Sequence, residues 1–236
     1  MSRRRVLLKI SGEALAPKGE KGVGEEQLAA VTNEVKAALE SYDLDIAMVV
    51  GGGNFLRGRE VSGERVRRVT ADHMGMLATI INGLAMQASL ESAGVETRVL
   101  SAIEVADVAE PFIVRRAIRH MEKGRVVIFV GGTGNPFFST DSAAALRANE
   151  IGADVLLKGT NVRGVYAEDP NKNPNAEFFE KVSFDQVLRL NLKVMDAAAF
   201  ALCRDNELRV RVFNMNEAGN IHRALGGEEL GTLVTN

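Results

Sequence analysis

The stretch RVLLKISG, residues 5–12, indicates how this chain folds. Residues 5–10 are apolar from Val6 onward except for Lys9, and Ser11 and Gly12 follow directly. A short, nearly continuous apolar run is typical of a strand that is covered on both faces in a mostly parallel sheet. The small residues after it suit a tight turn into the next element. The stretch therefore predicts a buried strand that ends abruptly.

Five further runs of this kind are rich in β-branched residues and occupy residues 45–50, 96–100, 125–130, 154–158 and 209–213. Between them, apolar residues recur at helical spacing. One such stripe is Leu28, Val31, Val35 and Leu39, and a second is Met74, Leu77, Ile81, Leu84 and Ala88. Alternating strands and helices predict an α/β fold around a central, mostly parallel sheet.

Two signals mark helix ends. Ser183 and Gln186 have the spacing of a capping box, which predicts a short helix that runs through Leu190. Gly124 follows a helical segment that includes Met121, and a glycine is common just after a helix. The polar loop 169–175 contains two prolines and breaks regular structure.

Length and composition exclude several classes of protein. The 236 residues are 46% hydrophobic and 25% charged, as in a folded globular protein, and they allow a single domain over 1–236. The net charge of −2 makes nucleic acid an unfavourable partner. The single cysteine, Cys203, cannot form an internal disulfide, which favours the cytosol. No run approaches the ~20 apolar residues of a membrane span, so we expect no membrane association.

Four predicted strands run directly into small residues. Parallel strands end at one edge of a sheet, so these turns are expected to lie together. Glycines let backbone N–H groups approach a ligand closely, which suits phosphate, although glycines also simply make tight turns. Four such turns beside Lys9, Arg57 and Asp141 favour a phosphate site. The turns are Lys9-Ile10-Ser11-Gly12, Gly51-Gly52-Gly53-Asn54, Gly131-Gly132-Thr133-Gly134-Asn135 and Lys158-Gly159-Thr160.

Common phosphate-binding motifs are absent from the sequence. It contains no G-x-x-x-x-G-K-[ST] motif, which excludes a P-loop enzyme, and no strict G-x-G-x-x-G motif, which weakens a dinucleotide-binding interpretation. The catalytic motifs of protein kinases are also missing. A different phosphate cradle is therefore expected.

Several segments resemble bacterial uridylate kinases, which belong to the amino-acid-kinase superfamily. The turn 51–54 by itself resembles only the superfamily, whereas the blocks at 72–76 and 133–138 are more specific to enzymes that act on UMP. The likeness covers nearly the whole chain. The matching segments are 8–15, 51–54 with Arg57-Gly58, 72–79, 133–141, 193–196 and 211–216.

The resemblance implies a three-layer sandwich of the amino-acid-kinase (carbamate-kinase-like) type. It implies that Mg-ATP phosphorylates UMP to UDP in de novo pyrimidine nucleotide synthesis, with Mg²⁺ arriving on ATP. Residues 1–155 would form the UMP-binding lobe, and residues 156–236 would contribute most of the site for the ATP nucleoside. It also implies a homohexamer built from dimers, with UTP as inhibitor. GTP activation stays open, because the charged loop 17–21 before Gly22-Val23-Gly24 is longer than in some members.

Motif positions assign residues to both substrates. On the ATP side the resemblance implies Lys9, Ile10, Ser11, Gly12, Gly53, Arg57, Thr160, Tyr166 and Asp169. On the UMP side it implies Gly52, Asp72, Thr133, Gly134, Asn135, Pro136, Phe137, Phe138, Ser139 and Thr140. The candidate catalytic residues are Lys9, Arg57 and Asp141. No residue is assigned as a direct metal ligand.

Each catalytic assignment has a structural alternative. Lys9 and Arg57 would neutralise phosphate charge, but either could simply be solvated. Asp141 would orient Lys9 or the Mg²⁺ shell, or it could be the N-cap of a helix over 142–149. Asp72 would accept hydrogen bonds from ribose, or cap the helix that it opens.

Further residues also have structural alternatives. Phe137 and Phe138 would form an apolar wall beside uracil, although one of them could belong to the core. Asp196 lies on a predicted helix over 194–204, and Lys193 directly precedes it. A solvated face is the simpler interpretation of both, and their roles stay open. The basic residues Arg65, Arg67 and Arg68 are expected to form a solvated face.

The apolar stripe at 74–88 could bury a partner helix or pack into the core. The sequence also leaves two alternative functions open. One is a kinase of the same fold that acts on a carboxylate or carbamate, and the other is a uridine-nucleotide sensor without turnover. A sensor should have lost Lys9 or Asp141, and both are present.

Overall fold

The central strand is β1 (Arg4–Ile10), which lies between β2 (Leu44–Val50) and β6 (Val155–Thr160) and runs parallel to both. The structure is a computed structural model that describes residues 3–56, 61–192 and 194–236. From Val6 to Ile10, β1 is buried, including the lysine in the run. This is the placement that a nearly continuous apolar strand requires.

One nine-stranded sheet organises the fold, in the order β4-β3-β5-β2-β1-β6-β10-β11-β9. Every pairing in it is parallel except that of β10 with β11. A separate hairpin joins β7 (Val165–Tyr166) to β8 (Phe178–Phe179). The other strands are β3 (Thr97–Ser101), β4 (Glu110–Pro111), β5 (Val126–Val130), β9 (Lys181–Ser183), β10 (Val210–Asn214) and β11 (Thr232–Thr235).

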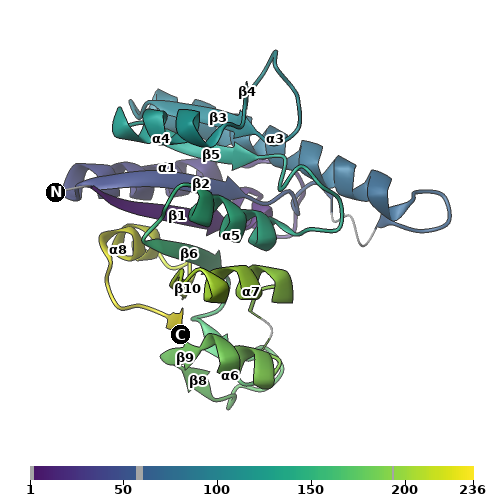
Figure 1. The fold of residues 1–236 in the computed structure, drawn as a ribbon, viewed down its shortest axis with the longest axis vertical. Coiled ribbons are helices and arrows are strands. Elements are labelled where there is room, and N and C mark those ends of the chain that lie inside the picture. Colours follow the sequence, from purple (N-terminus) through teal and green to yellow (C-terminus); the bar gives the residue numbers. More distant parts are fainter. Residues whose placement is uncertain (1–2, 57–60, 193) are drawn as a thin grey trace.

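Helices cover both faces of the sheet, and Figure 1 shows the strands between these two layers. On one face lie α1 (Glu25–Ser41), α3 (Arg68–Ser92) and α8 (Asn220–Gly226). On the other lie α4 (Val114–Glu122), α5 (Thr140–Glu150), α6 (Phe184–Arg189) and α7 (Ala197–Asp205). A short 3-10 helix, η1 (Gly12–Leu15), follows β1. The predicted α/β class and three-layer arrangement are confirmed.

The six predicted strands are all present, with ends within two residues of the expected ones. The capping box is confirmed, because Ser183 Oγ accepts from the Gln186 N–H and the Gln186 side chain accepts from the Ser183 N–H. Gly124 follows α4 with a φ of 75°, as expected of a residue that ends a helix. The sequence patterns did not reveal β11, β9 or the hairpin of β7 and β8, because these strands are only two to four residues long.

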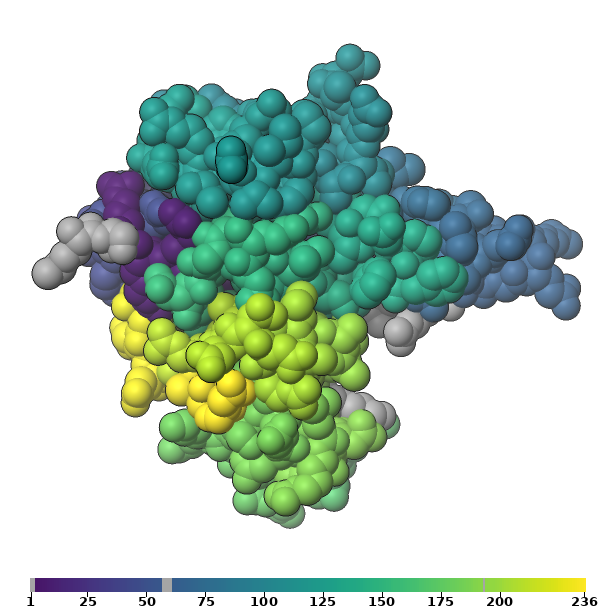
Figure 2. All heavy atoms as spheres, viewed as in Figure 1, coloured from purple at the N-terminus to yellow at the C-terminus, as the bar shows by residue number. Residues whose placement is uncertain are grey.

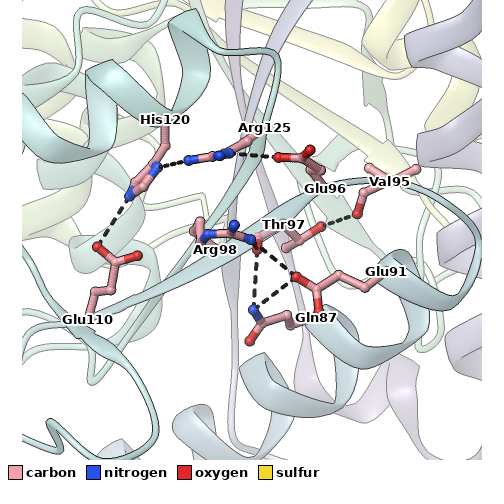
Figure 3. Close-up of polar contacts among 9 residues, drawn as sticks. All are labelled: Gln87, Glu91, Val95, Glu96, Thr97, Arg98, Glu110, His120 and Arg125. Carbon is pink, nitrogen blue, oxygen red and sulfur yellow. Dashed lines mark hydrogen bonds and ion pairs between the residues drawn. The ribbon is translucent and has the colours of Figure 1, made fainter.

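A chain of polar contacts fastens the edge of the sheet, as Figure 3 shows. His120 of α4 lies between Glu110 of β4 and Arg125, with nitrogen-to-partner distances of 3.2 Å to each. Arg125 also donates to Glu96, just before β3, at 2.8 Å. Only two residue pairs connect the short strand β4 to β3 in the sheet. The side-chain contacts add a second link, from β4 to the residues just before β3 and β5.

Cys203 of α7 is buried in the core, and burial raises the pKa of its thiol to about 12. This position agrees with its expected role as a small packing residue. Among the helices of the described residues, none has the length and apolar character needed to cross a membrane.

Close contact between α3 and β5 depends on a missing side chain. A Cβ atom at Gly83 would lie 2.3 Å from Cγ1 of Val130, which is buried in β5. Gly75, in the same helix, has no atom within 4 Å of the corresponding position. Substitutions at these two glycines therefore measure two effects on stability separately: packing at Gly83 and helix propensity at Gly75.

We expect Gly83→Ala to destabilise the protein by about 1–3 kcal/mol, because overpacking against a stiff valine outweighs the better helix propensity of alanine. Gly75→Ala, the matched control, should stabilise it by up to about 1 kcal/mol. Urea unfolding measures both. In a Val130→Ala background the cost of Gly83→Ala should disappear, and an unchanged cost there would contradict this packing account.

Candidate functional site

The turns after β1 and β2 are in direct contact at the carboxyl edge of the sheet. A Cβ atom at Gly12 would lie 2.4 Å from the carbonyl oxygen of Gly51, so both turns need glycine to approach this closely. Fully buried Asn82 of α3 donates to the same carbonyl at 2.7 Å and exchanges two hydrogen bonds with Asn54. The parallel pairings confirm that these turns share one edge.

The larger of two neighbouring hollows at this edge has a volume of about 610 Å³, and we name it the β6 hollow. It extends from the end of β6 to the hairpin of β7 and β8 and the loop after β7. Of the residues assigned to ATP, five line it: Lys9, Ser11, Thr160, Tyr166 and Asp169. Its wall also includes Lys158, Gly159 and Val212.

The second hollow, which we name the α3 hollow, has a volume of about 440 Å³ and lies between the start of α3 and the start of α5. Six residues assigned to UMP line it: Gly52, Asp72, Phe137, Phe138, Ser139 and Thr140. Asp141 and Asp196 also belong to its wall. The other assigned residues, Thr133, Gly134, Asn135 and Pro136, form the turn that leads to it, where Asn135 N–H donates to Thr133 Oγ1 at 3.2 Å.

The two hollows meet at a cluster of three charges. Lys9 Nζ lies 2.8 Å from Asp141 Oδ1, and Lys158 Nζ lies 2.5 Å from Asp141 Oδ2. The lysines are register partners on β1 and β6, and each is only 9% exposed. Lys158 also donates to the carbonyl of Val194. One carboxylate thus holds two ammonium groups between the hollows.

Burial alone would raise the pKa of Asp141, but the charges of Lys9 and Lys158 hold this pKa below its usual value. Burial lowers the pKa of Lys158, and the opposite charge of Asp141 counteracts that shift. The cluster carries two positive charges against one negative charge. An anion with access to both hollows would therefore be attracted to this point.

The start of α5 presents Asp141 to the lysines. Ser139 is the N-cap of this helix, with Oγ accepting from the N–H groups of Asp141 and Ser142 at 3.0 and 3.2 Å. The alternative interpretation of Asp141 as the N-cap is therefore wrong. Its carboxylate instead forms ion pairs with Lys9 and Lys158.

Asp72 connects α3 to the loop before α5. Its carboxylate accepts from Arg68 Nε at 2.8 and 2.9 Å and from the Phe137 N–H at 2.8 Å. Phe137 has a φ of 74°, an unusual backbone conformation for an aromatic residue, and this hydrogen bond helps to hold it. Asp72 lies within α3, so it is not the N-cap of that helix.

Three expectations are corrected here. Arg68 lines the α3 hollow and pairs with Asp72, so it is not part of a solvated basic face. Phe137 and Phe138 are 63% and 53% exposed, so neither belongs to the core. Asp196 is the N-cap of α7 and accepts from Ser139 Oγ and from Ser142 Oγ, the latter at 2.8 Å, so it is not on a solvated face.

Some assigned residues do not line the hollow that they were assigned to. The Ile10 side chain is in the core, Gly12 packs on the β2 turn, and Gly53 lines the α3 hollow, not the β6 hollow. Arg57 and Lys193 lie outside the described residues. Sequence reasoning missed Lys158 as a site residue, although it ends an apolar strand just as Lys9 does.

The chain is similar to known proteins over nearly its whole length. A sequence model described as the amino acid kinase family matches residues 4–214. Uridylate kinase of Xanthomonas oryzae pv. oryzae is 54% identical over 234 residues, which cover 99% of this chain and 97% of that protein. Uridylate kinase of Xanthomonas axonopodis pv. citri is 53% identical with the same coverage.

Solved structures give the same result. UMP kinase from Bacillus anthracis superposes with a TM-score of 0.94 at 38% identity, covering 100% of this chain and 97% of that chain. UMP kinase from Ureaplasma parvum superposes with a TM-score of 0.93 at 38% identity, covering 100% of both chains.

We expect Asp141→Asn to lower the free energy of unfolding at pH 7 by about 3–5 kcal/mol, because it leaves two buried ammonium groups without their counterion. Since the pKa of Asp141 is lowered in the folded protein, its stabilising effect is present above the unfolded-chain pKa and is lost as the pH falls below about 4. The gap between wild type and variant should therefore narrow in acid.

Urea unfolding at pH 7 and below about pH 4 measures the difference in unfolding free energy between wild type and Asp141→Asn. The control Asp185→Asn removes a carboxylate whose side chain is 84% exposed and should change stability by less than about 0.5 kcal/mol. A gap for Asp141→Asn that is equally wide at both pH values would contradict the assigned charge state.

Proposed function

The chain belongs to the amino acid kinase family, and from this membership we propose that it transfers the terminal phosphoryl group of Mg-ATP to UMP, which gives UDP and ADP. The observation that carries the proposal is the meeting of two hollows at Lys9, Asp141 and Lys158. A nucleotide in each hollow would place donor and acceptor phosphates on either side of this cluster. Phosphoryl transfer depends mainly on such positioning and on charge stabilisation.

ATP is proposed to occupy the β6 hollow. Tyr166 and Val212 offer apolar surface to a base, and Asp169 can accept hydrogen bonds from ribose. Its phosphates would then extend toward Lys9 and Lys158 at the inner end. The backbone N–H groups of the turn at Ser11 and Gly12 lie beside them and suit phosphate oxygens.

The two lysines are proposed to stabilise the negative charge that moves from donor to acceptor. Both ammonium groups are already desolvated and held in place by Asp141, so little reorganisation is needed when the charge develops. Asp141 acts as a positioning residue in this scheme. No side chain has to form a covalent intermediate, because UMP itself supplies the attacking oxygen.

Mg²⁺ is proposed to enter with ATP, as part of the substrate. Within residues 3–56, 61–192 and 194–236, no group of three or more His, Cys, Asp or Glu side chains could hold a metal ion. Mg²⁺ is commonly bound largely by nucleotide phosphates and water. When bound, the ion supplies further neutralisation of phosphate charge.

UMP is proposed to occupy the α3 hollow. Asp72 can accept hydrogen bonds from ribose, while exposed Phe137 and Phe138 offer an apolar wall to the pyrimidine. Arg68 lines the same hollow and adds a cation near the acceptor phosphate. A carboxylate or carbamate acceptor would leave this apolar wall unused.

Assembly into a homohexamer built from dimers is also proposed, and a measurement of the protein's molecular mass in solution tests it. Met74, Leu77 and Ile81 of α3 are 38%, 50% and 49% exposed, so this part of the predicted stripe lies outside the core, whereas Leu84 packs against it. Figure 2 shows the first turns of α3 extending beyond the body of the molecule. Apolar side chains on a projecting helix suit burial against a second copy.

Inhibition by UTP is proposed from the similarity of the chain to uridylate kinases. UTP would compete through its uridine for the α3 hollow. If GTP activates, the loop at Gly22 is linked to the site, because its N–H donates to the carbonyl of Asn54 at 3.1 Å and Asn54 Nδ2 donates back at 2.6 Å. The cytosol is the proposed location, where a free Cys203 stays reduced.

A coupled assay of ADP release tests the acceptor. With ATP, we expect turnover with UMP that exceeds turnover with CMP or dTMP by at least tenfold, and none with glutamate or carbamate. The α3 hollow combines a ribose acceptor with a pyrimidine-sized wall, which disfavours dTMP, glutamate and carbamate. Discrimination against CMP is proposed to come from the hydroxyl groups and the Asn135 amide of residues 133–140, which can read the polar edge of uracil. Turnover of a carboxylate acceptor, or binding of UMP without any turnover, would contradict the proposal and support a related kinase or a sensor.

Replacing either lysine tests the charge cluster. Lys9→Ala and Lys158→Ala should each lower kcat by about 100-fold or more, since each removes a desolvated cation from the transferring phosphoryl group. Neither should unfold the protein, because Asp141 keeps one partner. The control Lys36→Ala removes a partly exposed lysine of α1 that lies outside both hollows and should leave kcat unchanged. A normal kcat in Lys158→Ala would remove that residue from the mechanism.

A further inference from the structure

A third hollow lies away from both substrate hollows, on the far side of the last three strands of the sheet. We name it the outer hollow. It has a volume of about 500 Å³, and four cationic side chains line it: Arg163, Lys181, Arg211 and Arg223. None of these four lines the β6 or α3 hollow. The proposed phosphoryl transfer gives this region no role.

Strand register explains the placement of two of these cations. Arg211 of β10 pairs with Leu233 of β11, and Leu233 pairs with Lys181 of β9. Register partners project from the same face of a sheet, so these side chains form one row across three strands. Their neighbours Val212, Val234 and Val182 point into the core on the other face. Two strand spacings, about 10 Å, separate the two cations at the backbone.

Three of the four cations have unused hydrogen-bonding capacity. Arg211 makes one side-chain hydrogen bond within the described part of the chain, from Nη1 to the carbonyl of Leu230 at 3.0 Å, out of five guanidinium donors. The guanidinium carbon of Arg163 lies 4.1 Å from the centroid of the Phe178 ring. In the same described residues, no ion pair engages Arg163, Lys181 or Arg211, whereas Arg223 is paired with Glu228 at 2.7 Å.

Three carboxylates line the same hollow, yet within the described residues no ion pair joins them to these cations. Glu217 accepts from the side chains of Asn214 and Asn220 at 2.9 and 3.1 Å. Glu180 and Glu229 also belong to the wall. Partial burial lowers the pKa of Arg211, and the charge of Glu229 only counteracts this shift. The four remaining guanidinium donors of Arg211 are available to an acceptor that enters the hollow.

We propose that the outer hollow binds the oligophosphate group of a small molecule along the Arg211–Lys181 row, with Arg163 as the third cation. An extended polyanion fits this row better than a single phosphate, because the cations belong to strands two spacings apart. The concave shape favours a small molecule over a flat nucleic-acid surface. The carboxylates can accept hydroxyl or amine hydrogens of such a ligand.

Isothermal titration calorimetry with inorganic tripolyphosphate tests this site on the full-length protein. The titration is carried out in saturating UMP and a non-hydrolysable ATP analogue, so that both substrate hollows are filled. We expect one binding event per chain for wild type, and binding of orthophosphate that is at least tenfold weaker. Lys181→Gln, an exposed substitution that should not affect folding, is expected to weaken tripolyphosphate binding at least fivefold, and Arg211→Gln/Lys181→Gln at least 20-fold.

Two controls identify the site. Lys18→Gln removes an exposed lysine outside the outer hollow and should bind like wild type. Lys9→Ala, titrated without nucleotides, should keep this binding event while losing any that belongs to the β6 hollow. The proposal is overturned if wild type binds no tripolyphosphate at millimolar concentration, if the double variant binds as wild type does, or if Lys9→Ala alone abolishes binding. Because the readout is binding, it is independent of whether UMP is phosphorylated.

Discussion

The structure depends most on the pairing of one buried carboxylate with two buried ammonium groups. Lys9 and Lys158 lie near the carboxyl ends of neighbouring strands with their side chains on the same side of the sheet, where alone they would repel each other and lose hydration. Asp141 makes this arrangement tolerable by contacting both at 2.8 and 2.5 Å. The remaining positive charge is then held at one point, between the two hollows that the substrates would fill.

The surrounding fold can be understood as the support for that point. Parallel pairing of β1 with β2 and β6 brings three glycine-containing turns to one edge, and the absence of a side chain at Gly12 lets two of them touch. On the opposite side, Ser139 caps α5 so that the carboxylate of Asp141 is available for the lysines. Asp196 ties α7 to the same helix start through Ser142. Sheet, helix cap and neighbouring helix therefore all fix the position of one carboxylate.

Sequence patterns were sufficient for the main strands, the long helices and the shared edge of glycine turns, because those features depend on local apolar spacing. They were insufficient where a role depends on residues far apart in the chain. Lys158 shows this, since its partner Asp141 is placed by the packing of α5 on the sheet. Arg68 is a second case: its pairing with Asp72 is local, at i,i+4 spacing, but the fold also brings the distant Phe137 ring beneath its guanidinium. The short strands β9 and β11 are set by pairing partners that no local pattern reveals.

The central claim concerns where the transferred phosphate lies, and a crystal structure with UMP and a non-hydrolysable ATP analogue tests it most directly. The account predicts the terminal phosphate of the analogue within hydrogen-bonding distance of both Lys9 Nζ and Lys158 Nζ, facing the phosphate of UMP across the junction of the β6 and α3 hollows. A triphosphate found elsewhere, with both lysines contacting only Asp141, would contradict it.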